Sequence, residues 1–268
     1  MTHSPIGVLD SGIGGLTILG EIVRKSPNVS TMYIADSKYC PYGSRSEDEI
    51  YSLTKRLVEF LMSKNVKLII LACNTMSVIC LEKLRKEFPI VMFVGTVPAI
   101  KPAVQQSKKK IIGMLATRRT AESRYNQTLI QQFAGDCQII VRGTDRLVPL
   151  IEDGKTNDTV FRDVLFEELI PFKEAGVDVF VLGCSHFPIV RESMQEILGP
   201  DVIIMDSGFA IAQQVQRVLS QKKKSEDRFD VTHQFFTTGD VKRIEDSLLK
   251  IGILDSPSYT IDQLFIAE

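Results

Sequence analysis

The sequence lacks the features that define several large classes of protein. No stretch approaches the roughly 18 consecutive apolar residues that a membrane-spanning helix needs. The chain of 268 residues has a formal net charge of only −1, so it offers no electrostatic footprint for nucleic acid or for an anionic membrane. Only five residues precede the first apolar run, which leaves no room for a signal peptide, and we expect a cytoplasmic protein.

Patterns of cysteine that mark metal sites and disulfide frameworks are absent too. The five cysteines include no paired spacing such as C-x-x-C, so we expect no metal site. An odd number of cysteines without a secretory signal favours free thiols over a set of disulfide bonds. Cys40, Cys80 and Cys137 receive no function from their pattern, and for Cys80 and Cys137 we expect a small buried apolar role.

A nucleotide-binding motif is also missing, although a glycine turn lies near the N-terminus. Gly12, Gly14 and Gly15 follow Asp10 with a spacing that fits neither G-x-G-x-x-G nor the Walker motif. An aspartate at the tip of a strand would repel a phosphate unless a metal came between them. A carboxylate there suits an ammonium group or a proton exchanged with a neighbouring base. A regulatory module that binds a nucleotide or a sugar stays open as the weaker interpretation.

Two similar stretches stand out in what the sequence does contain. Leu68–Ser77 and Val177–Phe187 are each a continuous apolar run that ends in a small residue, a cysteine and short polar side chains. Such runs are typical of parallel strands buried on both faces. In open α/β sheets the ligand lies beyond the carboxyl ends of the strands, so Cys73 and Cys184 lie where we expect a substrate. Two structural cysteines are the alternative, but the capping residues shared by both stretches favour a function.

Strand-like and helix-like patterns alternate along the chain, which is typical of βαβ units and a parallel sheet. Ile112–Leu115 repeats the pattern of Ile6–Leu9 at an offset of 106 (112 − 6), and Cys184 follows Cys73 by 111 (184 − 73). These nearly equal offsets predict an α/β protein with two copies of one unit. The predicted domains are residues 1–97 plus 207–268 and residues 98–206.

Two further segments carry expectations of their own. A helical pattern over Thr120–Phe133 predicts one helix in the second copy. Near the C-terminus, the short apolar run His233–Thr237 and a helix over Asp240–Lys250 are too small to form a domain. We expect these two elements to pack back onto the first copy.

The two cysteines begin turns into helices, and this position has chemical consequences. The helix dipole and the exposed N–H groups at a helix N-terminus favour a thiolate. Asn74, Thr75 and Ser185 supply short polar groups beside Cys73 and Cys184. A pair of such helix N-termini can hold a carboxylate without an arginine.

Each cysteine also has a candidate partner for proton exchange. His186 stands beside Cys184, and Asp10 could serve Cys73 in the same way. A hydrolytic Cys–His dyad is an alternative, but it leaves the second cysteine without a task. Two opposed bases suit the removal and return of a proton at one carbon.

Five motifs occur in order along the chain, and together they carry a resemblance. They are Asp10-Ser11-Gly-x-Gly-Gly, Pro41-Tyr42-Gly43-Ser44, Ala72-Cys73-Asn74-Thr75, Val148-Pro149-Leu150-Ile151-Glu152 and Gly183-Cys184-Ser185-His186-Phe187-Pro188. From Ile6 to about Val218 the chain resembles the glutamate racemases of the aspartate/glutamate racemase superfamily. The resemblance implies two pseudo-symmetric α/β domains with mostly parallel sheets and an active site in the cleft between them.

The resemblance also implies an activity and the residues that perform it. It implies interconversion of L-glutamate and D-glutamate without a cofactor or metal, which supplies D-glutamate for peptidoglycan. Cys73 would remove the α-proton of D-glutamate and Cys184 that of L-glutamate. The implied catalytic residues are Cys73, Cys184, Asp10, His186, Glu152 and Asp36. The implied substrate-binding residues are Asp10, Ser11, Pro41, Tyr42, Gly43, Asn74, Thr75, Thr117, Thr120, Ser185 and His186.

Some details stay open within this resemblance. Asp10 and His186 would be the partners of the two cysteines, whereas Asp36 and Glu152 could be supporting residues or solvated loop acids. Residues 142–146 stand in place of a segment that contains Cys-Pro in many members of the family. One carbon separates aspartate from glutamate, and a fitted pocket distinguishes them by only about 1–3 kcal/mol, so an aspartate racemase is the nearest rival. A homodimer is open as an assembly.

Overall fold

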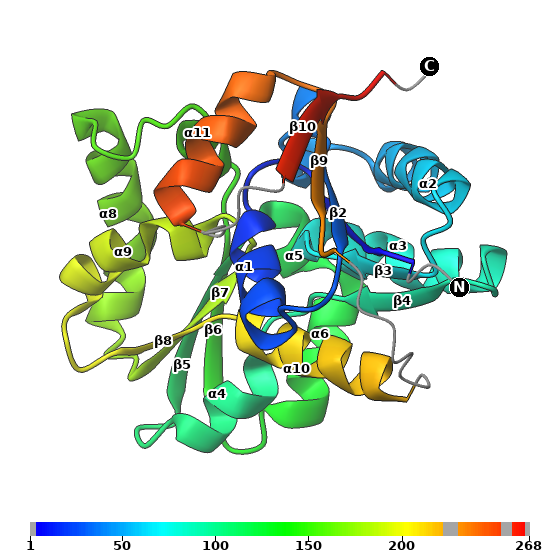
Figure 1. The fold of residues 1–268 in the computed structure, drawn as a ribbon. Coiled ribbons are helices and arrows are strands. Elements are labelled where there is room, and N and C mark those ends of the chain that lie inside the picture. Colours follow the sequence, from blue (N-terminus) through cyan, green and yellow to red (C-terminus); the bar gives the residue numbers. More distant parts are fainter. Residues whose placement is uncertain (1–3, 222–229, 253–258, 266–268) are drawn as a thin grey trace. The chain divides into compact units, whose positions relative to one another are not determined.

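The structure is a computed structural model that describes residues 4–221, 230–252 and 259–265 (Figure 1). It divides into two compact units, unit 1 with Met1–Thr96 and Gly208–Glu268, and unit 2 with Val97–Ser207. Each unit contains a sheet in which all paired strands are parallel, with helices between successive strands. The predicted α/β class with mostly parallel sheets is confirmed. No helix in the described part of the chain is long and apolar enough to cross a membrane.

Unit 1 is built on a six-stranded sheet in the order β10-β9-β2-β1-β3-β4. Its strands are β1 (Ile6–Asp10), β2 (Thr31–Ala35), β3 (Leu68–Leu71), β4 (Met92–Gly95), β9 (His233–Thr237) and β10 (Tyr259–Gln263). Its helices are α1 (Leu16–Lys25), α2 (Glu47–Ser63), α3 (Asn74–Glu87), α10 (Gly208–Ser220), α11 (Val241–Ile251) and the short 3-10 helices η1 (Ser37–Tyr39) and η2 (Tyr42–Ser44). Strand β9 pairs with β2, so the C-terminal segment does pack onto the first copy, as expected.

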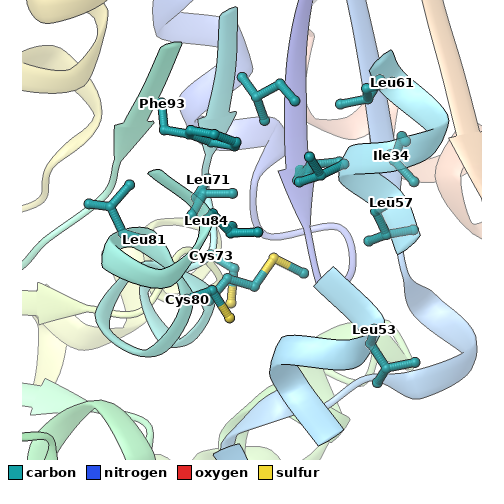
Figure 2. Close-up of a cluster of buried hydrophobic side chains, with 14 of the residues drawn as sticks. Ile34, Leu53, Leu57, Leu61, Leu71, Cys73, Cys80, Leu81, Leu84 and Phe93 are labelled. Atoms are coloured by element: carbon teal, nitrogen blue, oxygen red, sulfur yellow. The ribbon is translucent and has the colours of Figure 1, made fainter. Parts of the chain in front are cut away.

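The core on one side of this sheet explains why α2 and α3 lie where they do. Helix α2 presents Leu53, Leu57 and Leu61 at intervals of four residues, which places them on one face of the helix. Figure 2 shows these side chains gathered with those of β3, β4 and α3 in one buried cluster. Cys80 belongs to this cluster, and its burial raises the pKa of its thiol to about 12. The buried apolar role expected for Cys80 is therefore confirmed.

Unit 2 is built on a four-stranded sheet in the order β6-β5-β7-β8. Its strands are β5 (Ile111–Ala116), β6 (Gln138–Gly143), β7 (Val179–Gly183) and β8 (Ile203–Met205). Its helices are α4 (Ile100–Gln106), α5 (Arg118–Glu122), α6 (Arg124–Phe133), α7 (Leu147–Glu152), α8 (Thr159–Glu174), α9 (Arg191–Leu198) and the 3-10 helix η3 (Phe187–Val190). These elements run from blue-green at α4 through green to yellow in Figure 1.

The two sheets repeat one topology. The order β2-β1-β3-β4 in unit 1 has the same connectivity as β6-β5-β7-β8 in unit 2. Cys73 follows β3 and Cys184 follows β7, so the two cysteines occupy equivalent places in the repeat. The single helix predicted over Thr120–Phe133 is wrong in detail. Ser123 ends α5, and its hydroxyl accepts the Asn126 N–H at the start of α6.

Candidate active site

In unit 1, the ends of three neighbouring strands bring polar side chains to the carboxyl edge of the sheet. Asp10 ends β1 and Asp36 directly follows β2. Cys73 follows β3, with Ala72 between the strand and the cysteine. Asp10, Asp36 and Cys73 are all at least 95% buried. Buried carboxylates need hydrogen-bond partners, so the groups that bond Asp10 and Asp36 show what fixes these side chains.

The glycine turn after β1 fixes Asp10. The Gly12 N–H donates to Asp10 Oδ1 at 2.9 Å, and the Tyr33 hydroxyl donates to the Gly12 carbonyl at 2.6 Å. A Cβ atom at Gly15 would lie 2.6 Å from the Cβ of Asp10, so only glycine lets α1 begin this close to the carboxylate. This turn therefore uses a backbone donor on its own aspartate, which weakens the case for a nucleotide site.

Cys73 stands immediately before the first turn of α3, as the sequence predicts. Its Sγ lies 3.6 Å from the Ser11 hydroxyl, which comes from the turn after β1. The N-terminal end of α3 is tied to the sheet by Ser77, whose hydroxyl donates to the Leu71 carbonyl and accepts the Thr96 N–H, both at 2.9 Å. Ser77 was not in the predicted set, because its role depends on β3 and β4 rather than on its neighbours in sequence.

Asn74, the first residue of α3, carries a buried donor that is not satisfied. The residue is 3% exposed, and its side-chain Nδ2 has no hydrogen-bond partner among the described residues. Leaving a buried donor unpaired costs about 1–3 kcal/mol. Such an atom beside a buried thiol is therefore a candidate contact for a bound ligand.

Asp36 is a buried acid with two hydroxyl partners, not a solvated loop acid. The Tyr42 hydroxyl donates to Oδ2 at 2.5 Å, and the Thr238 hydroxyl donates to Oδ1 at 2.7 Å. Burial raises the pKa of Asp36 despite these two hydrogen bonds. Burial, together with the charge of Asp36, raises the pKa of Tyr42 well above its usual value, so this phenol stays protonated as a donor. Tyr42 also packs in the hydrophobic cluster that contains Cys73.

In unit 2, Cys184 stands at the start of a line of three ionisable groups. Its Sγ lies 3.8 Å from His186 Nδ1, and His186 Nε2 lies 2.5 Å from Glu152 Oε1. The side chains of His186 and Glu152 are 2% and 8% exposed. A carboxylate on Nε2 favours the proton on that nitrogen and directs Nδ1 toward the sulfur. Glu152 is therefore part of this line, and the alternative of a solvated loop acid is wrong.

The remaining predicted residues of unit 2 lie at the same edge of its sheet. Thr117 follows β5, and its hydroxyl donates to the Thr120 hydroxyl at 2.9 Å. Strand β5 pairs with β7 so that Ala116 lies opposite Gly183, the residue before Cys184. Thr117, Thr120 and Ser185 are all at most 5% exposed. This edge thus combines hydroxyl groups with a thiol and an imidazole.

Comparison with known proteins agrees with the motifs. Residues 6–215 match the family model described as Asp/Glu/Hydantoin racemase. The chain belongs to the Asp/Glu/hydantoin racemase family. A glutamate racemase of Herpetosiphon aurantiacus is 40% identical over 82% of this chain and 86% of that protein.

Solved structures of glutamate racemases share the fold of this chain. A glutamate racemase isoform of Bacillus anthracis, RacE1, is 29% identical with a TM-score of 0.86 and covers 99% of both chains. The Escherichia coli glutamate racemase, solved with L-glutamate and the activator UDP-MurNAc-Ala, is 30% identical with a TM-score of 0.86. That match covers 98% of this chain and 99% of the other. The resemblance to glutamate racemases and the prediction of an amino-acid racemase are confirmed.

Within this racemase fold, the predicted residues occur as two groups. Unit 1 holds Asp10, Ser11, Asp36, Cys73, Asn74 and Thr75 with the η2 residues Tyr42 and Gly43, which Pro41 precedes. Unit 2 holds Thr117, Thr120, Glu152, Cys184, Ser185 and His186. Their catalytic and binding roles stay predictions.

Proposed function

We propose that this protein interconverts L-glutamate and D-glutamate by proton transfer at the α-carbon, with Cys73 and Cys184 as its two bases. The observation that carries the proposal is the equivalent placement of the two buried thiols, each after the same strand of a repeated sheet. The names of the similar racemases support the choice of glutamate as substrate. We propose that the reaction needs neither a cofactor nor a metal.

The proposed chemistry balances with two thiols alone. Starting from L-glutamate, the Cys184 thiolate takes the α-proton and leaves a carbanion. The Cys73 thiol then donates its proton to the opposite face of that carbon, which gives D-glutamate and a Cys73 thiolate. The reverse reaction exchanges the two roles. One base that removed and returned the proton on the same face would regenerate the starting enantiomer.

The groups around the thiols suit a substrate with two carboxylates and an ammonium group. In unit 1, the unpaired Nδ2 of Asn74 and the N-terminus of α3 are donors for a carboxylate, and Asp10 can accept an ammonium group or a proton. In unit 2, the hydroxyl groups beside Cys184 are further donors. We propose the full predicted set of binding residues, in both units, as substrate contacts.

The partners of the two thiols differ in kind. His186, held by Glu152, can receive the Cys184 proton or stabilise its thiolate. Asp10 is assigned to Cys73, with the Ser11 hydroxyl contributing a contact to the sulfur. Asp36 acts on Cys73 indirectly, through Tyr42, which donates to Asp36 and packs in the cluster that contains Cys73.

The biological setting is proposed from the family resemblance. D-glutamate from this reaction would enter peptidoglycan, and the enzyme would work in the cytoplasm as a monomer or a homodimer. Cells depleted of the protein should then need added D-glutamate to grow. Normal growth and an unchanged cell wall in depleted cells would contradict this role.

The first test is a chiral assay of the purified protein with L-glutamate and L-aspartate side by side. Glutamate should racemise and aspartate should not. Cys73→Ala and Cys184→Ala should each abolish turnover, because each direction needs one thiolate and one thiol together. Cys80→Ala is the matched control, since the Cys80 thiol lies within α3 against the Thr54 hydroxyl of α2, at 3.6 Å, and it should retain activity. Equal turnover of aspartate, or a substantial rate in either active-site variant, would refute the proposal.

A second test assigns the partners of the thiols. Asp10→Asn and His186→Asn should each lower kcat by roughly 10²–10⁴, the usual contribution of a positioned acid or base. The enantiomers are equally stable, so kcat/KM must stay equal in the two directions for every variant. The asymmetry should therefore be measured as the isotope effect on kcat/KM with α-deuterated substrates.

The two variants should show opposite isotope effects. In His186→Asn, proton removal from L-glutamate becomes the slow step, so the effect should rise with L-glutamate and fall with D-glutamate. Asp10→Asn should show the reverse. His233→Asn is the control, because this buried histidine bonds the Thr31 hydroxyl at 2.9 Å at the start of β2. Matching isotope effects in both directions for both variants would refute the pairing.

A further inference from the structure

The segment that departs from the family motif gathers around one buried carboxylate. Glu168 lies on α8, and its side chain is 4% exposed. The Thr144 hydroxyl donates to Glu168 Oε1 at 2.8 Å, and Arg142 Nε donates to Oε2 at 2.5 Å. Arg146 Nη1 lies 3.7 Å from Oε1. Both oxygens of Glu168 are therefore occupied, Oε2 by a residue near the end of β6 and Oε1 by residues of the turn between β6 and α7.

These contacts continue to the first turn of α7. The Arg146 N–H donates to the Thr144 hydroxyl at 3.2 Å, and Arg146 is the residue that precedes this helix. No side-chain hydrogen bond caps α7 at that residue. The chain of hydrogen bonds from Glu168 through Thr144 thus fixes the entry into the helix.

The other end of α7 carries Glu152, the carboxylate on His186. The helix is six residues long, or about 9 Å at 1.5 Å per residue, so its two ends move together. Its last residue places Oε1 2.5 Å from His186 Nε2, and His186 Nδ1 lies 3.8 Å from the Cys184 sulfur. A shift at the start of α7 would therefore move Glu152 and change its hydrogen bond to the His186 imidazole.

The burial of Glu168 explains why its contacts are difficult to break. A buried carboxylate is stable only while its charge is paired and its oxygens are hydrogen-bonded. The side chains of Arg142 and Arg146 are 41% and 49% exposed, so the arginines reach inward from the surface to a fixed acid. The adjacent Glu167 also bonds Arg146, at 2.7 Å, but its side chain is 60% exposed. Pairs at exposed positions hold their partners weakly.

We propose that Glu168 is a positioning residue for Cys184. It fixes the residues before α7, so that Glu152 keeps its hydrogen bond to His186. His186 in turn keeps its position beside the Cys184 thiol. This inference rests on the proposed function for its effect on rate. Its structural part, the link from Glu168 to the imidazole, can be tested without turnover.

The test compares Glu168→Gln with the matched control Glu167→Gln. Glu168→Gln should lower kcat by roughly 10-fold, at the low end of the 10–100-fold that loss of a direct partner of a metal-bound histidine costs, because Glu168 acts on His186 only through Glu152. The isotope effect on kcat/KM should rise with α-deuterated L-glutamate and not with D-glutamate. Glu167→Gln should match the parent in both measurements. Equal isotope effects in both directions for Glu168→Gln would overturn the proposal and leave a purely structural role.

A double-mutant cycle with Glu152→Gln sharpens this result. If Glu168 acts only through Glu152, the double variant should be no slower than Glu152→Gln alone. Losses that multiply would contradict the proposed route. If Glu168→Gln does not fold, Thr144→Val removes the hydroxyl that links Glu168 to the Arg146 N–H, and it should show the same directional isotope effect. A Thr144→Val enzyme with parent kinetics would overturn the proposal.

An NMR readout separates this inference from the proposed function. In protein labelled with ¹⁵N-histidine, the ring signals of His186 should shift in Glu168→Gln and stay unchanged in Glu167→Gln. Shifted signals in a protein that fails to racemise glutamate would refute the function and keep the positional link. Unchanged His186 signals in Glu168→Gln would overturn the link whether or not the protein is active.

Discussion

The parallel pairing of β3 with β1, and of β7 with β5, is the constraint on which the site residues depend. In unit 1 the Ala72 N–H donates to the Leu9 carbonyl at 2.8 Å, which extends the pairing beyond β3 up to the residue before Cys73. In unit 2 Gly183 pairs with Ala116 directly before Cys184. Cys73 therefore stands at the N-terminus of α3, where backbone donors become available, whereas Cys184 begins a turn that leads to the 3-10 helix η3.

The surroundings of the two thiols differ although the strands that carry them are equivalent. Cys184 has an imidazole whose far nitrogen lies against a carboxylate, whereas Cys73 has a hydroxyl, and the aspartate that ends the neighbouring strand β1 is fixed by its own turn. A repeated fold can thus present the same thiol twice with different neighbours, which we propose as separate proton partners. That separation suits a reaction in which the two enantiomers place their α-protons on opposite faces of one carbon.

Much of the fold could be predicted because its signals are local. The apolar runs of β3 and β7 indicate buried strands without any knowledge of their neighbours, and the cysteines follow directly from the strand ends. Strand β10 has no such signal, because it lies at the edge of its sheet and contains no fully buried residue. Glu152 bonds His186, and Glu168 bonds Thr144, across long separations in sequence. No local sequence pattern predicts such contacts.

The most direct measurement of the two-base account is the fate of the α-hydrogen in heavy water. Racemisation should be started from L-glutamate and stopped early, and deuterium should be measured separately in recovered L-glutamate and in new D-glutamate. If Cys184 removes the protium and Cys73 delivers a solvent-derived deuteron, early D-glutamate should be labelled while remaining L-glutamate is not. Equal early label in both enantiomers would contradict the account, because it would require one base to remove and return the proton.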